Sequence, residues 1–283
     1  MPTTASVLAD SIAPSGARIT TMLISYPRIV HAEMTRHRAF SRSVGSSRAI
    51  PVARQRDAIV ANPFVPNAWG ENQRGMVAAG DLDEDSSRAA EAIWRAALAD
   101  MERHTKALEA LRVHKQLANR LLEVFSYTTE VVTATDWENL FVQRRHPDAQ
   151  PQIREVSELM YDAYTASTPK LTKAGEWHLP FADDATSKNL PLDVRQRISA
   201  ARCARTSYLT HDGRHSVDDD LALFDRLLVG GAIGHMSPME HQATPLPFPG
   251  TNRSRNFHGW HQWRESIESS YSNLVRTLSP SKA

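Results

Sequence analysis

Five basic side chains stand close together in residues 35–50, where their chemistry suits an anion. This stretch reads T-R-H-R-A-F-S-R-S-V-G-S-S-R-A-I and contains Arg36, His37, Arg38, Arg42 and Arg48. Guanidinium groups are planar donor forks that match phosphate oxygens in pairs, and serine hydroxyls and free backbone N–H groups add further donors. The stretch therefore predicts a site for a phosphorylated ligand; the plain alternative is a solvated helix face followed by a loop.

Other chemistries find little support in the sequence. No G-x-G-x-x-G follows a strand-like segment, so neither a P-loop nor a dinucleotide fold is indicated, and no G-x-S-x-G elbow presents a serine nucleophile. Cys203 lies within an expected helix, where packing is the simpler interpretation. The pairs His211/His215 and His258/His261 have a helical spacing, but Asp212-Gly213 indicates a loop and H-E-x-x-H is absent, so no metal site is predicted.

Bulk composition limits the class of protein. The chain has 283 residues with 33 basic and 32 acidic side chains, so no general nucleic-acid-binding field is expected. A single cysteine excludes a disulfide framework and fits a reducing compartment. No signal pattern or membrane-length apolar run is present, which favours a cytoplasmic protein without a membrane partner.

The elements that must position the basic stretch form an α+β pattern. Residues Ile19–Tyr26 predict a strand, Pro27 begins a helix that ends at the arginines, and residues 41–47 predict a serine and glycine loop. We expect one domain over residues 1–283, with residues 1–16 as a flexible arm and 62–84 as an ordered insertion or loop. Long helices should pack on a small mixed or antiparallel sheet. The remaining helices are expected at 51–61, 85–111, 115–125, 149–166, 193–205, 216–229 and 257–266, with a strand at 130–135 and a capping box at 135–138.

Three motifs together resemble a known family. R-H-R at Arg36–Arg38, followed by seven residues, Ser46, one residue and Arg48, is similar to the R-H-R-x7-S-x-R signature of the flavin-dependent thymidylate synthases. Residues 136–154 resemble that family's C-terminal block. A-A-R-C-A-R-T-S-Y at 200–208 and S-P-M-E-H at 237–241 resemble its A-R-x-S-F and T-P-F-E-H. In the family these last two motifs precede R-H-R, so we infer a circular permutation, with fusion of a half-domain as the other account.

The resemblance implies a flavoenzyme. Family members bind FAD between the subunits of a homotetramer and methylate dUMP to dTMP with methylenetetrahydrofolate and NADPH. By position, Arg154 would lie against the pyrimidine ring as the catalytic residue, where a fixed charge stabilises the polarised ring. The implied cofactor-binding residues are Arg36, His37, Arg38, Arg144, Ser207 and His241. The implied nucleotide-binding residues are Glu33, Arg36, Ser46, Ser47, Arg48 and Arg154.

Several positions differ from the family pattern and leave alternatives open. Ser43-Val44 stand where the family has Asn-Glu, Glu33 replaces a glutamine, and residues 126–129 lack the arginine that holds phosphate. Arg253 or Arg255 could hold the phosphate instead. Because a carboxylate accepts from an exocyclic amine, Glu33 suits methylation or hydroxymethylation of another pyrimidine nucleotide such as dCMP. A non-catalytic nucleic-acid-binding protein is the alternative of another class, and the balanced charge argues against it.

Overall fold

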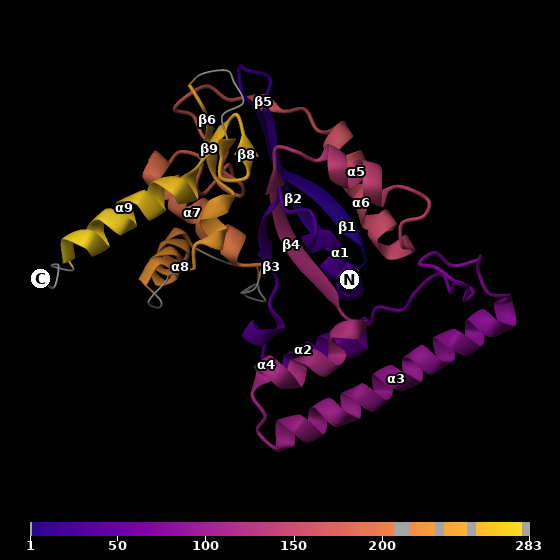
Figure 1. Ribbon diagram of the computed structural model, residues 1–283. Coiled ribbons are helices and arrows are strands. Elements are labelled where there is room, and N and C mark those ends of the chain that lie inside the picture. The colour runs from indigo at the N-terminus through magenta and orange to yellow at the C-terminus, as the bar shows by residue number, and fades with distance from the viewer. Residues whose placement is uncertain (1, 207–215, 230–234, 248–252, 279–283) are drawn as a thin grey trace, which may run out of the picture.

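A five-stranded sheet with the strand order β3-β4-β2-β1-β5 lies at the centre of the molecule (Figure 1). The computed structural model describes residues 2–206, 216–229, 235–247 and 253–278. Neighbouring strands are antiparallel except that β5 is parallel to β1. The strands of this sheet are β1 (Thr4–Ile12), β2 (Arg18–Pro27), β3 (Ser41–Val44), β4 (Tyr127–Ala134) and β5 (Lys170–Leu171). The predicted α+β class with a small mixed sheet is confirmed.

Helices surround the sheet on both sides. In Figure 1, α5 and α6 lie on one side of β1–β4, whereas α7, α8 and α9 gather on the other side with the short strands β6–β9. The α-helices are α1 (His31–Thr35), α2 (Val52–Ala61), α3 (Glu84–Ala110), α4 (Lys115–Ala118), α5 (Glu138–Arg144), α6 (Pro151–Ala166), α7 (Leu192–Ala204), α8 (Val217–Val229) and α9 (Trp263–Leu278). The 3-10 helices are η1 (Arg28–Val30), η2 (Ser47–Ala49), η3 (Asn119–Phe125) and η4 (Ser237–Glu240). The short strands are β6 (Ala243–Pro245), β7 (Arg253–Ser254), β8 (Phe257–His258) and β9 (Trp260–Gln262).

Alternation along β2 gives the sheet two different faces. Met22, Ile24 and Tyr26 are fully buried and belong to the main core, which they share with residues of β4, α5 and α6. Thr21 points to the opposite face, because successive side chains of a strand alternate. That second face is covered by the chain beyond residue 171, and it carries hydroxyl groups rather than a continuous apolar surface.

A second core holds the C-terminal elements together. Residues of α7, α8 and η4 form a buried cluster that includes Ala200, Phe224 and Met239. Beside it, the fully buried carboxylate of Asp220 accepts from Arg202 Nε at 2.7 Å and from Arg205 Nε at 2.9 Å. Because an unpaired buried charge is costly, this ion pair network fixes how α7 and α8 pack.

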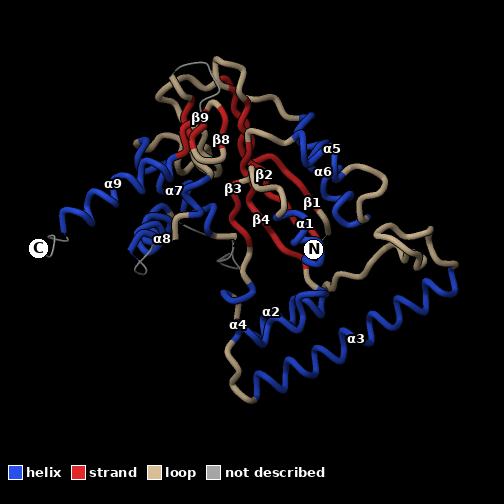
Figure 2. The backbone as a smooth tube through the Cα atoms, viewed as in Figure 1, coloured by secondary structure: helices blue, strands red, loops and turns tan. Residues whose placement is uncertain are grey.

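The longest helix, α3, lies below the sheet and away from it (Figure 2). Its first turn is capped by Asp83, whose side chain accepts from the Ser86 N–H at 2.7 Å. Leu98 packs with Leu122 and Phe125 of η3, and this contact attaches the helix to the rest of the chain. Within the described ranges, no helix is both long and apolar enough to span a membrane.

Most predicted elements are present, and four are wrong. Residues 4–12 are not an arm but strand β1, whose backbone pairs with β2. Residues 41–44 are not a loop but strand β3, which pairs with β4. The capping box at 135–138 does not form, because the residue before α5 is Trp137 and it makes no side-chain cap. Finally, residues 257–262 form β8 and β9 instead of a helix, with Gly259 at φ +73° between them. The pair His258/His261 is therefore not on a helix.

Candidate functional site

Strand β3 divides the basic stretch between the two faces of the sheet. Arg42 points to the face that carries α1, where its Nη1 donates to the fully buried Glu130 carboxylate at 2.7 Å. The same guanidinium also donates to the carbonyls of Met34 and His37. Ser43 points to the other face and lines a pocket. Arg42 is therefore a structural residue that fixes the R-H-R turn, and it is not available to an anion.

The R-H-R turn presents two free cations beside a neutral imidazole. The side chains of Arg36 and Arg38 are exposed, and neither has a hydrogen-bond or ion-pair partner in the described parts of the chain. His37 is buried, and its Nε2 accepts from Arg144 Nε at 3.1 Å. Burial, together with the guanidinium groups of Arg144 and Arg42, lowers the pKa of His37 to about 4. At neutral pH its imidazole is thus uncharged and oriented by α5.

Two further predicted residues, Arg154 and Glu33, do not line the pocket. Arg154 is in the first turn of α6, and its Nη1 donates to the Pro147 carbonyl at 2.8 Å. Glu33 lies on α1, where its Oε2 is buried and has no hydrogen-bond donor among the described residues. A buried carboxylate oxygen without a donor carries a desolvation cost, so an additional hydrogen-bond donor at this oxygen would be stabilising.

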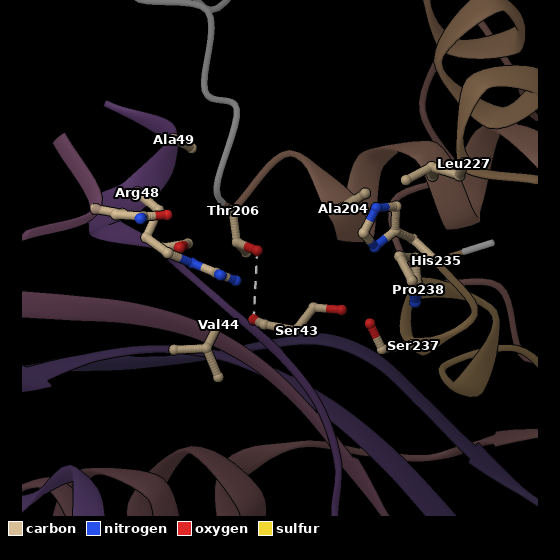
Figure 3. A pocket seen from close by; sticks show the side chains of 12 residues that line it. Ser43, Val44, Arg48, Ala49, Ala204, Thr206, Leu227, His235, Ser237 and Pro238 are labelled. Carbon is tan, nitrogen blue, oxygen red and sulfur yellow. Dashed lines mark hydrogen bonds between the residues drawn. The ribbon is translucent and has the colours of Figure 1, made fainter. Parts of the chain in front are cut away.

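A pocket of about 410 Å³ lies where the two halves of the chain meet (Figure 3). Figure 3 shows Arg48 and Thr206 on one side of it, His235, Ser237 and Pro238 on the other, and Ser43 between them. The described lining residues are Ser43, Val44, Ser46, Arg48, Ala49, Gln116, Ala204, Thr206, Leu227, His235, Ser237 and Pro238.

The lining of this pocket is basic and rich in hydroxyl groups. Arg48 is exposed and has no hydrogen-bond or ion-pair partner among the described residues. No acidic residue is among the described residues that line the pocket. An uncompensated guanidinium surrounded by hydroxyl and amide donors favours an anionic ligand.

Ser46 and Ser47, adjacent in the sequence, face different surroundings. Ser46 lines the pocket. Ser47 is buried, and its hydroxyl donates to Glu123 at 2.7 Å while its carbonyl accepts from Asn119 at 2.7 Å. Ser47 therefore fastens η2 to η3, and it does not line the pocket.

His241 is the innermost of the predicted site residues. It is fully buried, with Nε2 at 2.9 Å from the Ser43 hydroxyl and Nδ1 at 2.8 Å from the Thr133 hydroxyl. Burial lowers its pKa to about 3. The predicted residue Ser207 lies outside the described residues. Its neighbour Thr206 lines the pocket and donates to the Ser43 carbonyl at 3.3 Å.

The structure also identifies lining residues that the sequence reasoning did not assign to the site. Ser43, Gln116, His235 and Ser237 contribute polar atoms to the pocket. Ser237 belongs to the S-P-M-E-H motif, which was a usable signal, whereas Gln116 carries none. The suggested phosphate ligands Arg253 and Arg255 do not line the pocket, and Arg255 is instead paired with Glu268. Among the described residues, no group of three or more potential ligands could hold a metal ion.

The fold and the site define an α+β protein with a basic, hydroxyl-lined pocket between its two halves. The family model described as thymidylate synthase complementing protein matches residues 17–170, more than half of the chain. The chain belongs to this family, the flavin-dependent thymidylate synthases, and is a flavin-dependent enzyme of the methyltransferase type.

Solved structures with similar backbones were also found. One is the UMP/dUMP methylase PolB from Streptomyces cacaoi bound with 5-Br UMP, with 16% identity and a TM-score of 0.49 over 58% of this chain and 89% of that chain. Another is the flavin-dependent thymidylate synthase ThyX from Helicobacter pylori complexed with FAD and dUMP, with 19% identity and a TM-score of 0.35 over 52% of this chain and 67% of that chain. No curated protein sequence matches the chain.

Proposed function

We propose that this enzyme reductively methylates dUMP to dTMP, with methylenetetrahydrofolate as the one-carbon donor and NADPH as the hydride source. The observation that carries the proposal is the pocket beside Arg48. Its volume of about 410 Å³ suits a nucleoside monophosphate, and its described lining holds a cation but no carboxylate. Residues 17–170 and the C-terminal half both line it, so we further propose that the chain acts as one domain.

Arg48 is the proposed phosphate ligand. The family's arginine is absent from residues 126–129, so another cation has to balance the phosphate charge. Arg48 lines the pocket with a guanidinium that no described carboxylate neutralises, and Ser46 and Gln116 line the same pocket. A guanidinium can donate two parallel hydrogen bonds to a phosphate, which gives both affinity and orientation.

The R-H-R turn fits a bound FAD. Arg36 and Arg38 are exposed without described partners, and the neutral ring of His37 is held by Arg144. These four residues would hold the cofactor, and FAD would supply the redox chemistry of the reaction. None of them lines the pocket within one chain. We therefore propose that FAD lies between subunits of a homotetramer, where one subunit's turn meets another subunit's pocket. Arg154 would then stabilise negative charge on the pyrimidine.

The first experiment measures nucleotide binding. We expect Arg48→Ala to weaken dUMP binding about 10- to 100-fold, because a charge-assisted hydrogen bond contributes roughly 1.5–3 kcal/mol. The matched control is Arg54→Ala, which removes an exposed arginine of α2 outside the pocket. Calorimetric titration of both variants with dUMP decides the point. Equal affinity of Arg48→Ala and Arg54→Ala would show that this pocket is not the phosphate site.

The second experiment measures turnover. Purified protein should retain or take up FAD, which is visible in its absorbance spectrum. The reduced flavoprotein is then incubated with methylenetetrahydrofolate and dUMP, and the nucleotide products are analysed by mass. Formation of dTMP supports the proposal, whereas a protein that neither carries nor takes up FAD contradicts it.

Methylation or hydroxymethylation of dCMP is the second candidate, and Glu33 favours it. Its buried Oε2 has no donor among the described residues. Glu33 does not line the pocket of its own chain, so in the proposed tetramer an exocyclic amine bound in another subunit's pocket could supply that donor. If dCMP is the substrate, Glu33→Gln should lower its turnover and not that of dUMP. Modification of dCMP without turnover of dUMP would replace the first candidate with this one.

A further inference from the structure

A row of hydroxyl groups crosses four adjacent strands of the sheet on the face below the C-terminal half. Ser43 is on β3, Thr133 on β4, Thr21 on β2 and Ser11 on β1. Thr21 and Thr133 are directly opposite each other, and their hydroxyl oxygens are 2.7 Å apart. Ser43 is a diagonal neighbour of Thr133, because Thr133 pairs with Ser41. Ser11 is likewise a diagonal neighbour of Thr21, because Ser11 pairs with Ile19. The distance across each diagonal is therefore too long for a direct hydrogen bond.

Two histidines from the C-terminal half close these diagonals. His241 places Nδ1 at 2.8 Å from Thr133 Oγ1 and Nε2 at 2.9 Å from Ser43 Oγ. His178 places Nε2 at 2.7 Å from Thr21 Oγ1 and Nδ1 at 2.9 Å from Ser11 Oγ. The result is one unbroken chain of hydrogen bonds in the order Ser43, His241, Thr133, Thr21, His178, Ser11.

Solvent exposure distinguishes the ends of this chain from its middle. Ser43 and Ser11 retain 7% and 6% of their surface, whereas the four members between them retain 1% or less. Ser43 also lines the pocket. The chain therefore connects the pocket wall with β1, the strand next to the edge strand β5, through an interior that the described structure closes to water.

Each member carries one mobile hydrogen. Burial lowers the pKa of both His178 and His241 to about 3, so both rings are neutral at pH 7, with one N–H and one bare nitrogen. Six hydrogens then serve five contacts. If Ser43 donates to His241, every hydrogen points from the pocket toward Ser11 and both rings carry hydrogen on Nδ1. If all bonds reverse, both rings carry hydrogen on Nε2 and Ser43 donates into the pocket.

We propose that these six side chains form a proton relay between the pocket and Ser11. A proton from a pocket group binds Ser43 Oγ while the Ser43 proton passes to His241 Nε2. The shift continues through Thr133, Thr21 and His178, and the Ser11 proton passes to a water molecule beside β1. Each hydroxyl oxygen loses one proton and gains one. Each ring gains a proton on Nε2 and loses one from Nδ1 while its double bonds shift, so no charge stays in the sheet and no oxidant is needed.

The proposed reaction gives this relay a use. Replacement of a pyrimidine ring hydrogen by a one-carbon group releases that hydrogen as a proton, which must leave the pocket. This use rests on the proposed function, whereas the hydrogen-bonded chain itself does not depend on which nucleotide binds.

The ring tautomers test the relay without any substrate. If the two rings were opposite tautomers, both would donate toward the threonines or both would accept from them. In the first case one buried threonine hydroxyl hydrogen would have no acceptor in the chain, and in the second the 2.7 Å contact between Thr21 and Thr133 would contain no hydrogen. We therefore expect nitrogen-15 NMR of histidine-labelled protein at pH 7 to show His178 and His241 in the same neutral tautomer. Signals are assigned with His178→Gln and His241→Gln. Opposite tautomers, or a charged ring, overturn the proposal.

Conduction is tested under turnover with Thr133→Val, which removes the central hydroxyl and keeps the shape. Thr128→Val is the matched control, because Thr128 is buried on the same strand and its hydroxyl has no described partner. We expect Thr133→Val to lower kcat at least 10-fold at unchanged KM and to abolish a multi-proton solvent isotope effect, with Thr128→Val near wild type. Equal kcat values for the two variants overturn the relay. If Thr133→Val does not fold, Thr21→Val breaks the same contact. A protein without turnover of either nucleotide contradicts the proposed function, and the tautomer experiment still decides the relay.

Discussion

Glu130→Gln is the substitution that most directly tests how the R-H-R turn is held. Glu130 is fully buried on β4, and its carboxylate accepts from Arg42 at 2.7 Å and from the Tyr26 hydroxyl at 2.6 Å. A glutamine has nearly the same shape but no charge, and its amide group places a donor against one of these two donors. The guanidinium of Arg42 then remains in the interior with no carboxylate to balance it.

The magnitude follows from burial. Removal of one partner of a buried ion pair costs about 3–5 kcal/mol in the free energy of unfolding. The side chain of Arg42 keeps 14% of its surface, and it retains the carbonyls of Met34 and His37 as acceptors. Both features reduce the penalty, so we expect a loss of roughly 2–3 kcal/mol.

Urea unfolding followed by tryptophan fluorescence measures this loss. With a slope of about 2–3 kcal/mol per molar urea, the midpoint should fall by about 1 M. The matched control is Glu91→Gln, which removes an exposed partner of Arg95 on α3 and should cost less than about 0.5 kcal/mol. If the two variants have equal midpoints, the buried pair does not stabilise the turn and the reasoning fails.

Three shorter predictions concern other buried groups. Since folding lowers the pKa of His178 and His241 to about 3, the unfolded chain binds more protons between pH 6.5 and 3. Each ring should then remove about 1.4 kcal/mol of stability per pH unit as pH falls through this window. Urea midpoints of His241→Gln should therefore fall less steeply with pH than those of the wild type, and equal pH dependence of the two contradicts this. Burial raises the pKa of Cys203, so iodoacetamide should label it at pH 8 only in urea-unfolded protein. Gly45→Ala places a Cβ 3.3 Å from two backbone oxygens and should cost about 1–3 kcal/mol by thermal melting, whereas Gly80→Ala, in open space, should cost less.

Local patterns in the sequence located most helices. The expected helix at 85–111 is α3 (Glu84–Ala110), and Pro151 begins α6 where its missing N–H carries no cost. The helical structure of such segments follows from the spacing of their own apolar residues and from the residues that begin and end the helix. The motif residues around R-H-R were also visible, because their chemistry is concentrated in one short stretch.

Strand β3 could not be predicted in the same way. Serine and glycine at 41–47 are typical of a loop, and no local pattern reveals that the backbone of residues 41–44 pairs with β4 some ninety positions later. Tertiary pairing overrides local propensity here. The same pairing determines that Arg42 turns toward Glu130 while Ser43 turns toward the pocket.

His178 shows a second limit of sequence reasoning. It lies in W-H-L-P, between the predicted helices at 149–166 and 193–205, and nothing in its neighbours marks it as buried. Its place is set by contacts to Ser11 and Thr21 from the first 21 residues of the chain. A polar residue whose partners are this distant in sequence is identified only when the topology is known.

The polar face of the sheet also has a consequence for the order of synthesis. A ribosome completes β1 to β4 before it has made His178 or His241, so this face stays uncovered while 44 more residues are added up to and including His178, and 107 up to and including His241. Thr21, Thr133 and Ser43 offer water hydroxyl groups during that interval, whereas an apolar face would be open to aggregation. The hydroxyl row thus allows the N-terminal half to stay hydrated on the ribosome, and arrival of the two histidines replaces that water.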